Sequence, residues 1–440
     1  MIPQSLSLPS SSQGTRGTTP VSTGASDAVR PIGSPALGRP LRILMVAPTS
    51  FFLDYGCHVR ILEEARVLLG RGQQVRIVTY ANGQDMAGLD IRRCLTIPWR
   101  RDFEVGSSRH KLGLDLFLSA AVLRAAWSFR PDIIHGHLHE GALIGGAVAR
   151  VFNKPLVFDF QGSLTGEMVD HGFLRRDGRV YGPMRRLERL IDHLPSVIMH
   201  SSQNAAEHLR QDFGVPQRRL FSLPDFVNTA VFRPDVLTAS EREAERATLG
   251  IPPGRQVIAY LGLLARHQGT DLLMEAARQV VAARPDSHFL VMGFPGMDQY
   301  AAQAAALGIA GHVTFTGRVP YALAPRRLAL GDIAVAPKIA ETEGSGKLMN
   351  YMAMGLPTVA FDLPVCREYL GESALRVPPG DAGGFAAAIL GLLADPQGAA
   401  TMGRRLRLRA VESYDWSRGG DILMAAYDSA LRSRSLKAAA

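Results

Sequence analysis

The segment "ETEGSGKLMNYMAMGLPTVAFD", residues 341–362, contains the signals of a loop, a helix and a strand in close succession. The small residues Gly344, Ser345 and Gly346 indicate the loop, and a run of helix formers follows them. Gly355 and Pro357 end the helix, and the apolar residues around and after them predict a buried strand. A helix that leads from a loop into a strand in this way is typical of an α/β protein.

The same alternation of strands and helices runs through two series along the chain, and this segment belongs to the second. In the first series, strand patterns are "LRILMVAPTS", "QQVRIVTY", "PDIIHGH", "KPLVFDFQGS" and "SVIMHSS", and helix patterns include "HVRILEEARVLLGRG", "EGALIGGAVARVF" and "SQNAAEHLRQDFG". The second series has strand patterns "QVIAYLGLL", "HFLVMGF", "HVTFTGRV", "DIAVAPK" and "PTVAFD", with the helix "TDLLMEAARQVVAARP". Alternating strands and helices predict parallel, doubly wound sheets, whose ligands bind at the carboxyl ends of the strands.

These patterns divide the chain into four parts. Residues 1–40 are rich in Ser, Thr, Gly and Pro and predict a disordered tail. We expect doubly wound α/β domains over 41–230 and 231–415, joined through the polar linker "RPDVLTASEREAERATLGIPPGR". The last part, 416–440, contains the helix "GGDILMAAYDSALRSR", whose apolar positions suit packing against a domain.

Composition adds little about function. No secretory signal or membrane span is evident, so we expect a cytoplasmic protein. The formal charge of +9 is compatible with a phosphate-bearing ligand or an anionic surface. Cys57, Cys94 and Cys366 lie too far apart for a C-x-x-C motif, and we expect buried thiols.

Three alternating histidines, His135, His137 and His139, stand with Glu140 at the end of a predicted strand. Strand geometry would point all three imidazoles to one face. No cysteine or carboxylate follows at metal-ligand spacing, so we predict no metal site and expect a histidine that makes a polar contact or relays a proton.

The loop of the opening segment does not match the nucleotide triphosphatase P-loop. That motif needs Gly five residues before the Gly-Lys pair, where Glu341 stands, and Ser or Thr after the lysine, where Leu348 stands. The helix N-terminus from Gly344 to Lys347 still predicts an anion site. The carboxylates of Glu341 and Glu343 can accept hydrogen bonds from ligand hydroxyl groups.

From about Leu41 to Arg434 the chain resembles the retaining glycosyltransferases of family 4, which have the GT-B fold of two facing Rossmann-like domains. The segments that carry the resemblance are "DYGCHVRILEEARVLLGRGQQVRIVT", "PDIIHGH", "LPDFVNTAVFRP" and "MAMGLPTVAFD", in the order of the family motifs. The resemblance implies transfer of a sugar from a nucleotide diphosphate sugar with retention of configuration, a second domain that holds the donor, a C-terminal helix that crosses back onto the first domain, and no essential metal or other cofactor.

The resemblance also assigns individual residues. It places the glycine loop at Gly56, the active-site histidine at His137, and the base-contacting strand end at Gly317, Arg318 and Val319. The family's two glutamates fall near the opening loop. They match Thr342, or Glu343 if one residue is deleted, and Asn350, which can still donate a hydrogen bond to a ribose hydroxyl.

One departure from the family pattern concerns charge. After Gly262 the family has an arginine and a lysine that neutralise the leaving diphosphate, and this chain has Leu263 and Gln268 there. The candidate replacements are Arg266, Lys338 and Lys347, and we favour Lys347 together with the amides of Gly344, Ser345 and Gly346. A solvated surface lysine is the alternative.

We therefore expect a GT-B glycosyltransferase in which His137 contacts the donor sugar or acceptor, and Glu343 or Glu341 contacts the donor sugar. The acceptor is expected to be a glycan, a lipid-linked molecule or a small molecule, and no nucleic acid partner is expected. Arginines of "FLRRDGRVYGPMRRLERLID" could meet the anionic inner membrane face, or form a solvated helix face. The rival functions are a non-catalytic partner in polysaccharide assembly and another GT-B reaction, sugar-nucleotide epimerisation or phosphorolysis.

Overall fold

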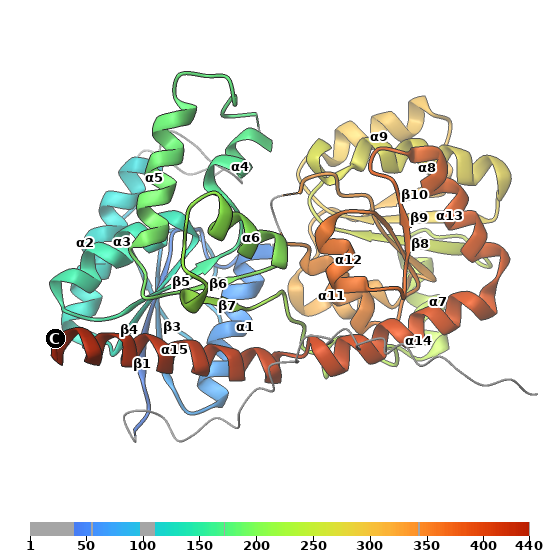
Figure 1. Cartoon of the computed structure of the whole chain (residues 1–440). Helices are drawn as coiled ribbons and strands as arrows, with labels where there is room; N and C mark the ends of the chain where they lie inside the picture. Colours follow the sequence, from blue (N-terminus) through green and yellow to red (C-terminus); the bar gives the residue numbers. More distant parts are fainter. Residues whose placement is uncertain (1–38, 54–55, 97–110, 171, 342–343, 440) are drawn as a thin grey trace, which may run out of the picture. The chain divides into compact units, whose positions relative to one another are not determined.

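The structure is a computed structural model that describes residues 39–53, 56–96, 111–170, 172–341 and 344–439. Almost all of the predicted tail therefore lies outside the described residues. The described residues belong to one compact unit. In the described residues this unit contains two parallel sheets flanked by helices, as the alternating pattern predicts (Figure 1).

The first sheet has the strand order β3-β2-β1-β4-β5-β6-β7, and each described neighbouring pair is parallel. Its strands are β1 (Arg42–Ala47), β2 (Gln74–Thr79), β3 (Asp90–Arg93), β4 (Ile133–His137), β5 (Leu156–Phe160), β6 (Val197–His200) and β7 (Leu220–Ser222). The helices of this part are α1 (Gly56–Gly70), α2 (Lys111–Phe129), α3 (Leu138–Val151), α4 (Leu164–Asp170), α5 (Tyr181–His193), α6 (Gln203–Gln211) and the short η1 (Gln217–Arg219).

The second sheet has the order β10-β9-β8-β11-β12-β13 and is also parallel. Its strands are β8 (Gln256–Leu261), β9 (Ser287–Met292), β10 (Val313–Phe315), β11 (Ile333–Ala336), β12 (Thr358–Phe361) and β13 (Leu375–Val377). Its helices are α7 (Ala239–Thr248), α8 (Thr270–Ala283), α9 (Met297–Ala306), α10 (Ala324–Leu328), α11 (Gly346–Ala353), α12 (Pro364–Leu370), α13 (Ala382–Ala394) and α14 (Pro396–Ser413), with the short η2 (Arg266–Gln268), η3 (Ala310–His312) and η4 (Tyr321–Leu323).

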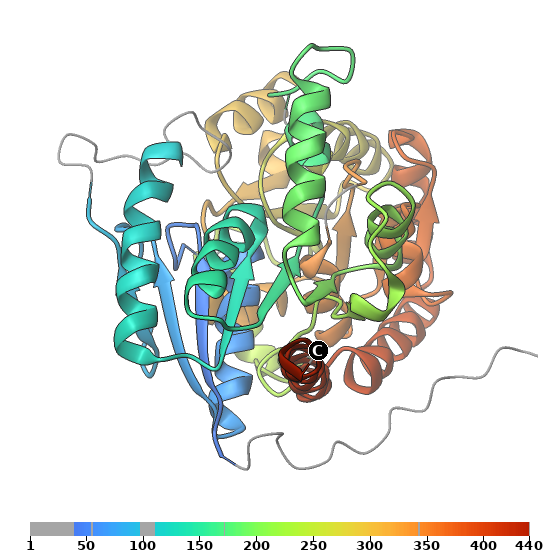
Figure 2. The same cartoon turned by 60° about the vertical axis from the view of Figure 1, so that its left-hand side comes forward.

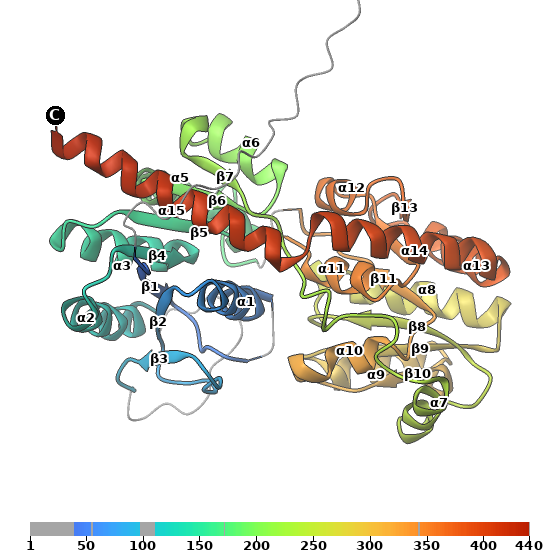
Figure 3. The same ribbon diagram turned by 90° about the horizontal axis from the view of Figure 1, so that it is seen from below.

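Both faces of the first sheet are covered, which explains why its strands are apolar runs and not alternating ones. One face packs against α2 and α3, with Leu44, Val46 and Ile134 in that core. The other face packs against α1 and the last helix, α15 (Trp416–Ala439), and carries Ile43 and Met45. Figure 3 shows α1 and α2 on opposite sides of β1 and β2, and α15 running beside β6.

The final helix, α15, contacts α1, β5, β6 and β7 of the first sheet. Leu423, Ala426, Tyr427 and Ala430 of this helix are fully buried. These are apolar positions at helical spacing, so the burial follows from the amphipathic pattern. The residue limits of the four predicted parts remain a prediction.

One prediction about the linker was wrong. The polar segment between the sheets contains α7, which begins at a capping box of Thr238 and Glu241. Arg242 and Arg246 of α7 both bind the carboxylate of Asp332, at 2.5 and 2.9 Å. A charged helix is therefore held by its cap and by ion pairs to the second sheet, not by an apolar stripe.

None of the helices in the described part of the chain has the length and apolar composition that a membrane span requires. Cys94 and Cys366 are buried as expected, while Cys57 is half-buried.

Candidate functional site

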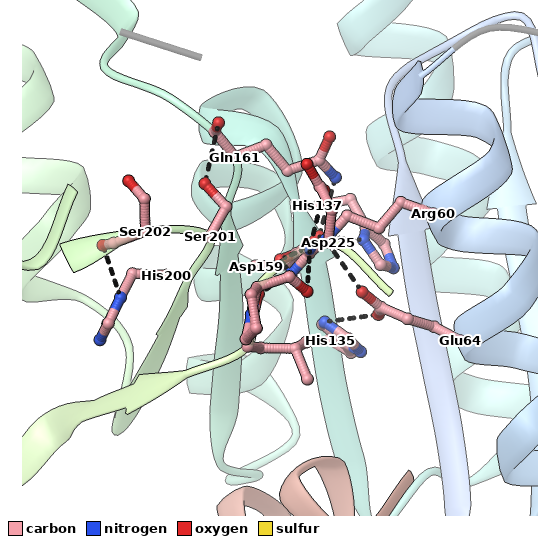
Figure 4. A network of polar contacts seen from close by, with 12 residues as sticks. Arg60, Glu64, His135, His137, Asp159, Gln161, His200, Ser201, Ser202 and Asp225 are labelled. Carbon is pink, nitrogen blue, oxygen red and sulfur yellow. Dashed lines mark hydrogen bonds and ion pairs between the residues drawn. The ribbon is translucent and has the colours of Figure 1, made fainter. Parts of the chain in front are cut away.

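The carboxyl ends of β4 and β5 carry a cluster of buried polar side chains (Figure 4). His137 and Asp159 are register partners on these two neighbouring parallel strands. Register partners point to the same face of a sheet, so the imidazole and the carboxylate meet: His137 Nδ1 lies 3.2 Å from Asp159 Oδ2. Gln161 Nε2 donates a further hydrogen bond of 2.8 Å to the same oxygen.

Helix α1 brings a guanidinium to this carboxylate. Arg60 is 5% exposed, and its Nη2 and Nε lie 2.7 and 3.0 Å from the two oxygens of Asp159. The same guanidinium donates to the carbonyl oxygens of Leu223 and Pro224, at 2.9 and 3.2 Å. Its Nη1 lies 3.3 Å from Asp225 Oδ1. The donors of this arginine thus bind the end of β5 and the segment just after β7.

The charges of this cluster are set by burial and by close pairing. Burial lowers the pKa of Arg60, but the carboxylates of Asp159 and Glu64 outweigh it and hold the pKa above its ordinary value. Burial raises the pKa of Asp159, but Arg60 and His137 outweigh it, so this carboxyl is ionised. Burial and the Asp159 charge raise the pKa of Glu64 well above its ordinary value, which favours its neutral form.

The histidines are divided between two sites, so the prediction that all three face one way was wrong. His135 and His137 stack with ring centroids 4.3 Å apart, and His135 Nδ1 lies 2.9 Å from the hydroxyl of Tyr427 on α15. The strand ends at His137, and His139 lies in the first turn of α3. A change from strand to helix breaks the two-residue period on which the prediction depended.

The predicted active-site histidine, His137, lies at the end of β4 but has no exposed surface. Its Nε2 has no hydrogen bond to any described residue. A bound sugar can reach this nitrogen only if the side chains that cover it move.

Another buried histidine, His58 of α1, holds the loop after β1. Leu53 donates its backbone N–H to His58 Nδ1 at 2.8 Å, so the proton of the neutral ring is on Nε2, which contacts Thr49 Oγ1. Burial, and secondarily the charge of Arg318, lowers the pKa of His58 to about 3. The residue predicted for close ligand approach, Gly56, meets nothing within 4 Å at its missing Cβ, so packing does not require glycine there.

In the second sheet, the loop of the opening segment precedes α11. Ser345 is the N-cap residue of α11, and its buried Oγ has no hydrogen bond to a described residue. Lys338, which is 1% exposed, donates from Nζ to the carbonyl oxygen of Gly344 at 2.8 Å. This lysine therefore supports the loop through the Gly344 carbonyl, and its predicted role as a phosphate ligand stays a prediction. Glu343 lies outside the described residues, and Glu341 is exposed.

Lys347 lies on the first turn of α11, beside Gln268. At the position of Gln268 the family has a lysine that this chain lacks. The Nζ of Lys347 is 2.9 Å from Oε1 of Gln268 and 4.6 Å from the ring centroid of Tyr260. A Cβ on Gly262 would lie 2.7 Å from the same Nζ, so the glycine leaves room for the ammonium group. The half-buried Lys347 is not the solvated surface lysine of the alternative interpretation.

The remaining predicted donor residues lie on several elements of the second sheet. Arg266 is exposed on η2, and Arg318 is exposed with its guanidinium over the Phe294 ring. Gly317 has a φ of +69°, and Val319 is half-buried. On α11, Asn350 is half-buried and Leu348 is fully buried in the core. Leu348 packs in the core of this structure, and its predicted contact with the donor stays a prediction.

Sequence patterns did not reveal Arg60, Glu64 and Asp159 as members of the site. The available signals were charged residues at core positions: Asp159 within the apolar strand "LVFDF", and Arg60 and Glu64 one turn apart on α1. Buried charges in such places are either paired or functional.

Two family models match consecutive parts of the chain. Residues 55–225 match a model described as "Glycosyl transferase 4-like domain", and residues 255–395 match one described as "Glycosyl transferases group 1". The first match contains the β4–β5 cluster, and the second contains Gln268 and Lys347.

Solved structures show the same fold. Sucrose-phosphate synthase from Thermosynechococcus elongatus superposes with a TM-score of 0.74 at 19% identity, over 91% of this chain and all of that one. HepE from Anabaena, in complex with UDP-glucose, gives a TM-score of 0.68 at 16% identity, over 90% of this chain and all of that one. These similarities confirm the predicted GT-B fold.

Among curated proteins, the D-inositol 3-phosphate glycosyltransferase of Segniliparus rotundus is 27% identical over 87% of this chain and 86% of its own length. The phosphatidyl-myo-inositol mannosyltransferase of Mycobacterium leprae is 26% identical over 90% of this chain and 98% of its own length. The fold and the matched models define a glycosyltransferase. The chain belongs to the family 4 type of GT-B glycosyltransferases, as the resemblance of its motifs predicted.

Replacing Arg60 with methionine should lower the free energy of unfolding by about 3–5 kcal/mol, because it leaves a buried, unpaired carboxylate at Asp159. The double variant Arg60→Met with Asp159→Asn should be less destabilised than the single variant. Urea denaturation of the full chain measures both. Arg66→Met is the matched control, since Arg66 pairs with Glu63 on the same helix but is 47% exposed, and it should cost less than about 1 kcal/mol. A double variant less stable than Arg60→Met would contradict the explanation.

Stability should also fall on acidification because of His58. The unfolded chain, with a histidine pKa of 6.5, binds more protons than the folded chain, in which the pKa is about 3. The contribution of His58 is therefore complete above pH 6.5 and is lost as the pH falls toward 3. At pH 5 the loss is about 2 kcal/mol. His58→Gln should have a flatter dependence of unfolding free energy on pH between 7 and 5, and an unchanged slope would contradict the assignment.

Proposed function

We propose that the protein is a retaining hexosyltransferase that uses a nucleotide diphosphate sugar as donor. Family membership supports transfer of a sugar, and HepE, which shares the fold, is described in complex with UDP and with UDP-glucose. The observation that carries the proposal is the position of the Lys347 ammonium, 2.9 Å from the amide oxygen of Gln268. This chain thereby retains a cation beside the position where the family places its lysine.

In the proposed complex, the diphosphate of the donor lies against the N-terminus of α11. The N-terminus of a helix carries the positive end of the helix dipole, which favours a bound anion there. Ser345 Oγ, which is buried and has no hydrogen bond to a described residue, adds a hydroxyl donor at the same end. Together with Lys347 these groups stabilise the negative charge that develops on the leaving diphosphate.

Retention of configuration follows if the acceptor attacks from the same side as the leaving group. The departing phosphate then accepts the proton of the acceptor hydroxyl, so no separate protein base is needed. In this scheme His137 contacts the donor sugar or the acceptor, Asn350 contacts the ribose, and Glu341 or Glu343 contacts the donor sugar. No metal or other cofactor takes part in the proposed transfer.

For the acceptor we propose a phosphate-bearing molecule, either soluble or in a lipid. Both curated relatives described above are named for acceptors that contain inositol and phosphate. The segment from Phe173 to Leu194 exposes basic residues beside apolar ones, as an anionic lipid surface or a phosphate would require. Its exposed arginines are Arg175, Arg176, Arg179, Arg186 and Arg189, while Arg185 is half-buried against Asp212; its exposed apolar residues are Phe173, Val180, Leu187, Leu190 and Leu194.

A thermal-shift panel of nucleotide diphosphate sugars identifies the donor, because a ligand at about a hundred times its dissociation constant stabilises the folded chain by about 2.7 kcal/mol. One stabilising donor would then be used in transfer assays. Binding without transfer to any acceptor would favour the non-catalytic rival, and consumption of donor without acceptor would favour an epimerase or phosphorylase.

Lys347→Ala should lower kcat/KM by on the order of 100-fold, since one preorganised group on a developing anion contributes about 3 kcal/mol. The double variant Lys347→Ala with Gln268→Lys should recover most of the activity, because it restores a lysine at the family position. Both are measured in the transfer assay with the donor found above. Lys154→Ala, at a half-buried lysine of the first sheet, is the control, and unchanged transfer by Lys347→Ala would overturn the role of Lys347.

If the arginine-rich segment binds anionic lipid, changing Arg176, Arg179 and Arg186 together to Gln should weaken binding to phosphatidylserine-containing vesicles about 100-fold. Co-sedimentation with the vesicles measures this affinity. Each arginine near such a surface contributes roughly 1 kcal/mol. The matched control changes three other exposed arginines, Arg218, Arg404 and Arg405, to Gln. Equal binding by the two triple variants, or binding to zwitterionic vesicles alone, would contradict the assignment.

A further inference from the structure

A second buried cluster lies on the other face of β5 from the β4–β5 site, beside Phe158 and Phe160. His139, from the first turn of α3, faces Glu188 and Asp192 of α5, which are one helical turn apart and share a face. His139 is 5% exposed, and both carboxylates have no exposed surface. Figure 2 shows α5 beside α3, which brings residues some 50 positions apart in the sequence together.

The distances within this cluster suit one shared ion. Nε2 of His139 lies 3.7 Å from Glu188 Oε1 and 3.5 Å from Asp192 Oδ1. Two ligand atoms at about 2.0–2.2 Å from a tetrahedral Zn²⁺ are roughly 3.4 Å apart. The three ligand atoms all lie within 4.8 Å of one another.

The cluster also has unused ligand atoms. Among the described residues, neither carboxylate oxygen of Asp192 nor Nε2 of His139 has a hydrogen bond. Buried polar atoms normally have hydrogen-bond partners. In addition, a protonated His139 could balance the charge of only one of the two carboxylates. A neutral histidine and two carboxylates around a divalent cation would leave the cluster without net charge.

The carboxylate of Glu188 is already held as a metal ligand would be. Ser163 Oγ donates to Oε1 at 2.7 Å, and the backbone N–H and Oγ1 of Thr165 donate to Oε2 at 3.1 and 2.5 Å. Outer hydrogen bonds of this kind orient the ligands of metal sites. The rings of Phe158 and Phe160 meet the His139 imidazole edge to face, at centroid distances of 5.2 and 5.4 Å, and fix its orientation.

We propose that His139, Glu188 and Asp192 bind a structural divalent transition metal, of which Zn²⁺ is the best match. Imidazole nitrogen and carboxylate oxygen are its ordinary ligands, and a water molecule would complete the tetrahedron. The metal joins the first turn of α3 to α5. His137 is the N-cap residue of α3, two positions before His139, so the metal also fixes the backbone that carries His137. It takes no part in the sugar transfer.

The test uses the tag-free full chain, treated with a chelator and dialysed against ZnCl₂. We expect one tightly bound equivalent by mass spectrometry of the metal content, and a higher Tm in ZnCl₂ than in chelator. Replacement by Co²⁺ should give the visible absorption of a tetrahedral site. No bound metal and an unchanged Tm would overturn the proposal and leave an ion pair of His139 with Asp192.

Conservative variants assign the bound equivalent to this cluster. Asp192→Asn and Glu188→Gln should each lose it, with affinity reduced at least tenfold. The control is Glu64→Gln, which alters the other buried group of possible ligands, Glu64 with His135 and His137, and should keep it. Retention of zinc by Asp192→Asn, or its loss only in Glu64→Gln, would overturn the assignment. The wild-type measurement does not depend on the folding of any variant.

Discussion

The buried ion pair of Arg60 and Asp159 constrains the whole first part of the molecule. One guanidinium binds the end of β5 and also the carbonyl oxygens of Leu223 and Pro224, where the chain leaves the first sheet. Desolvation of both charges is costly, so the pair persists only with this complete set of partners. The position of α1, the end of β5 and the course of the chain toward the second sheet are thus fixed together.

Asp225 extends this constraint to the loop at Gly344–Gly346, which precedes α11. Its carboxylate lies 3.3 Å from Arg60, and a Cβ on Gly344 would approach it to 2.6 Å. Burial raises the pKa of Asp225, while Arg60 and Lys338 act in the opposite direction. Lys338 in turn binds the carbonyl oxygen of Gly344. The loop before α11 is therefore supported by the alternating charges of Arg60, Asp225 and Lys338 and does not depend on its own sequence alone.

Periodicity and turn residues predicted the fold well, because parallel strands and their helices carry local signals in this chain. The prediction failed at α7, where Thr238 and Glu241 did give a capping signal but the polar composition favoured a linker. Stability there comes from ion pairs with Asp332, a partner some 90 residues away that no local pattern contains.

For the candidate site, the sequence predicted the loop at Gly344–Gly346 and His137. It also showed that Leu263 and Gln268 replace the family's arginine and lysine. It could not indicate which groups meet in space. Lys347 and Gln268 are 79 positions apart, and Arg60 and Asp159 are 99 apart. His139 was grouped with its sequence neighbours because the strand was assumed to continue, and its carboxylate partners on α5 were missed. Contacts of this range follow from packing, so only the folded chain reveals them.

The contact between Lys347 and Gln268 restricts the order in which such a site can change during evolution. A lineage that moved its cation from one position to the other without losing it must have carried both lysines for a time. The Lys347 ammonium now lies 2.9 Å from the amide oxygen of Gln268, so a lysine at position 268 would bring a second ammonium group close to it. Two close ammonium groups repel, which favours loss of a proton from one of them. Once a lysine at position 347 is present, the lysine at position 268 is no longer needed. Repulsion between the two ammonium groups would then favour its loss. A search that requires a lysine at position 268 would overlook the cation that Lys347 places 2.9 Å from the Gln268 amide oxygen.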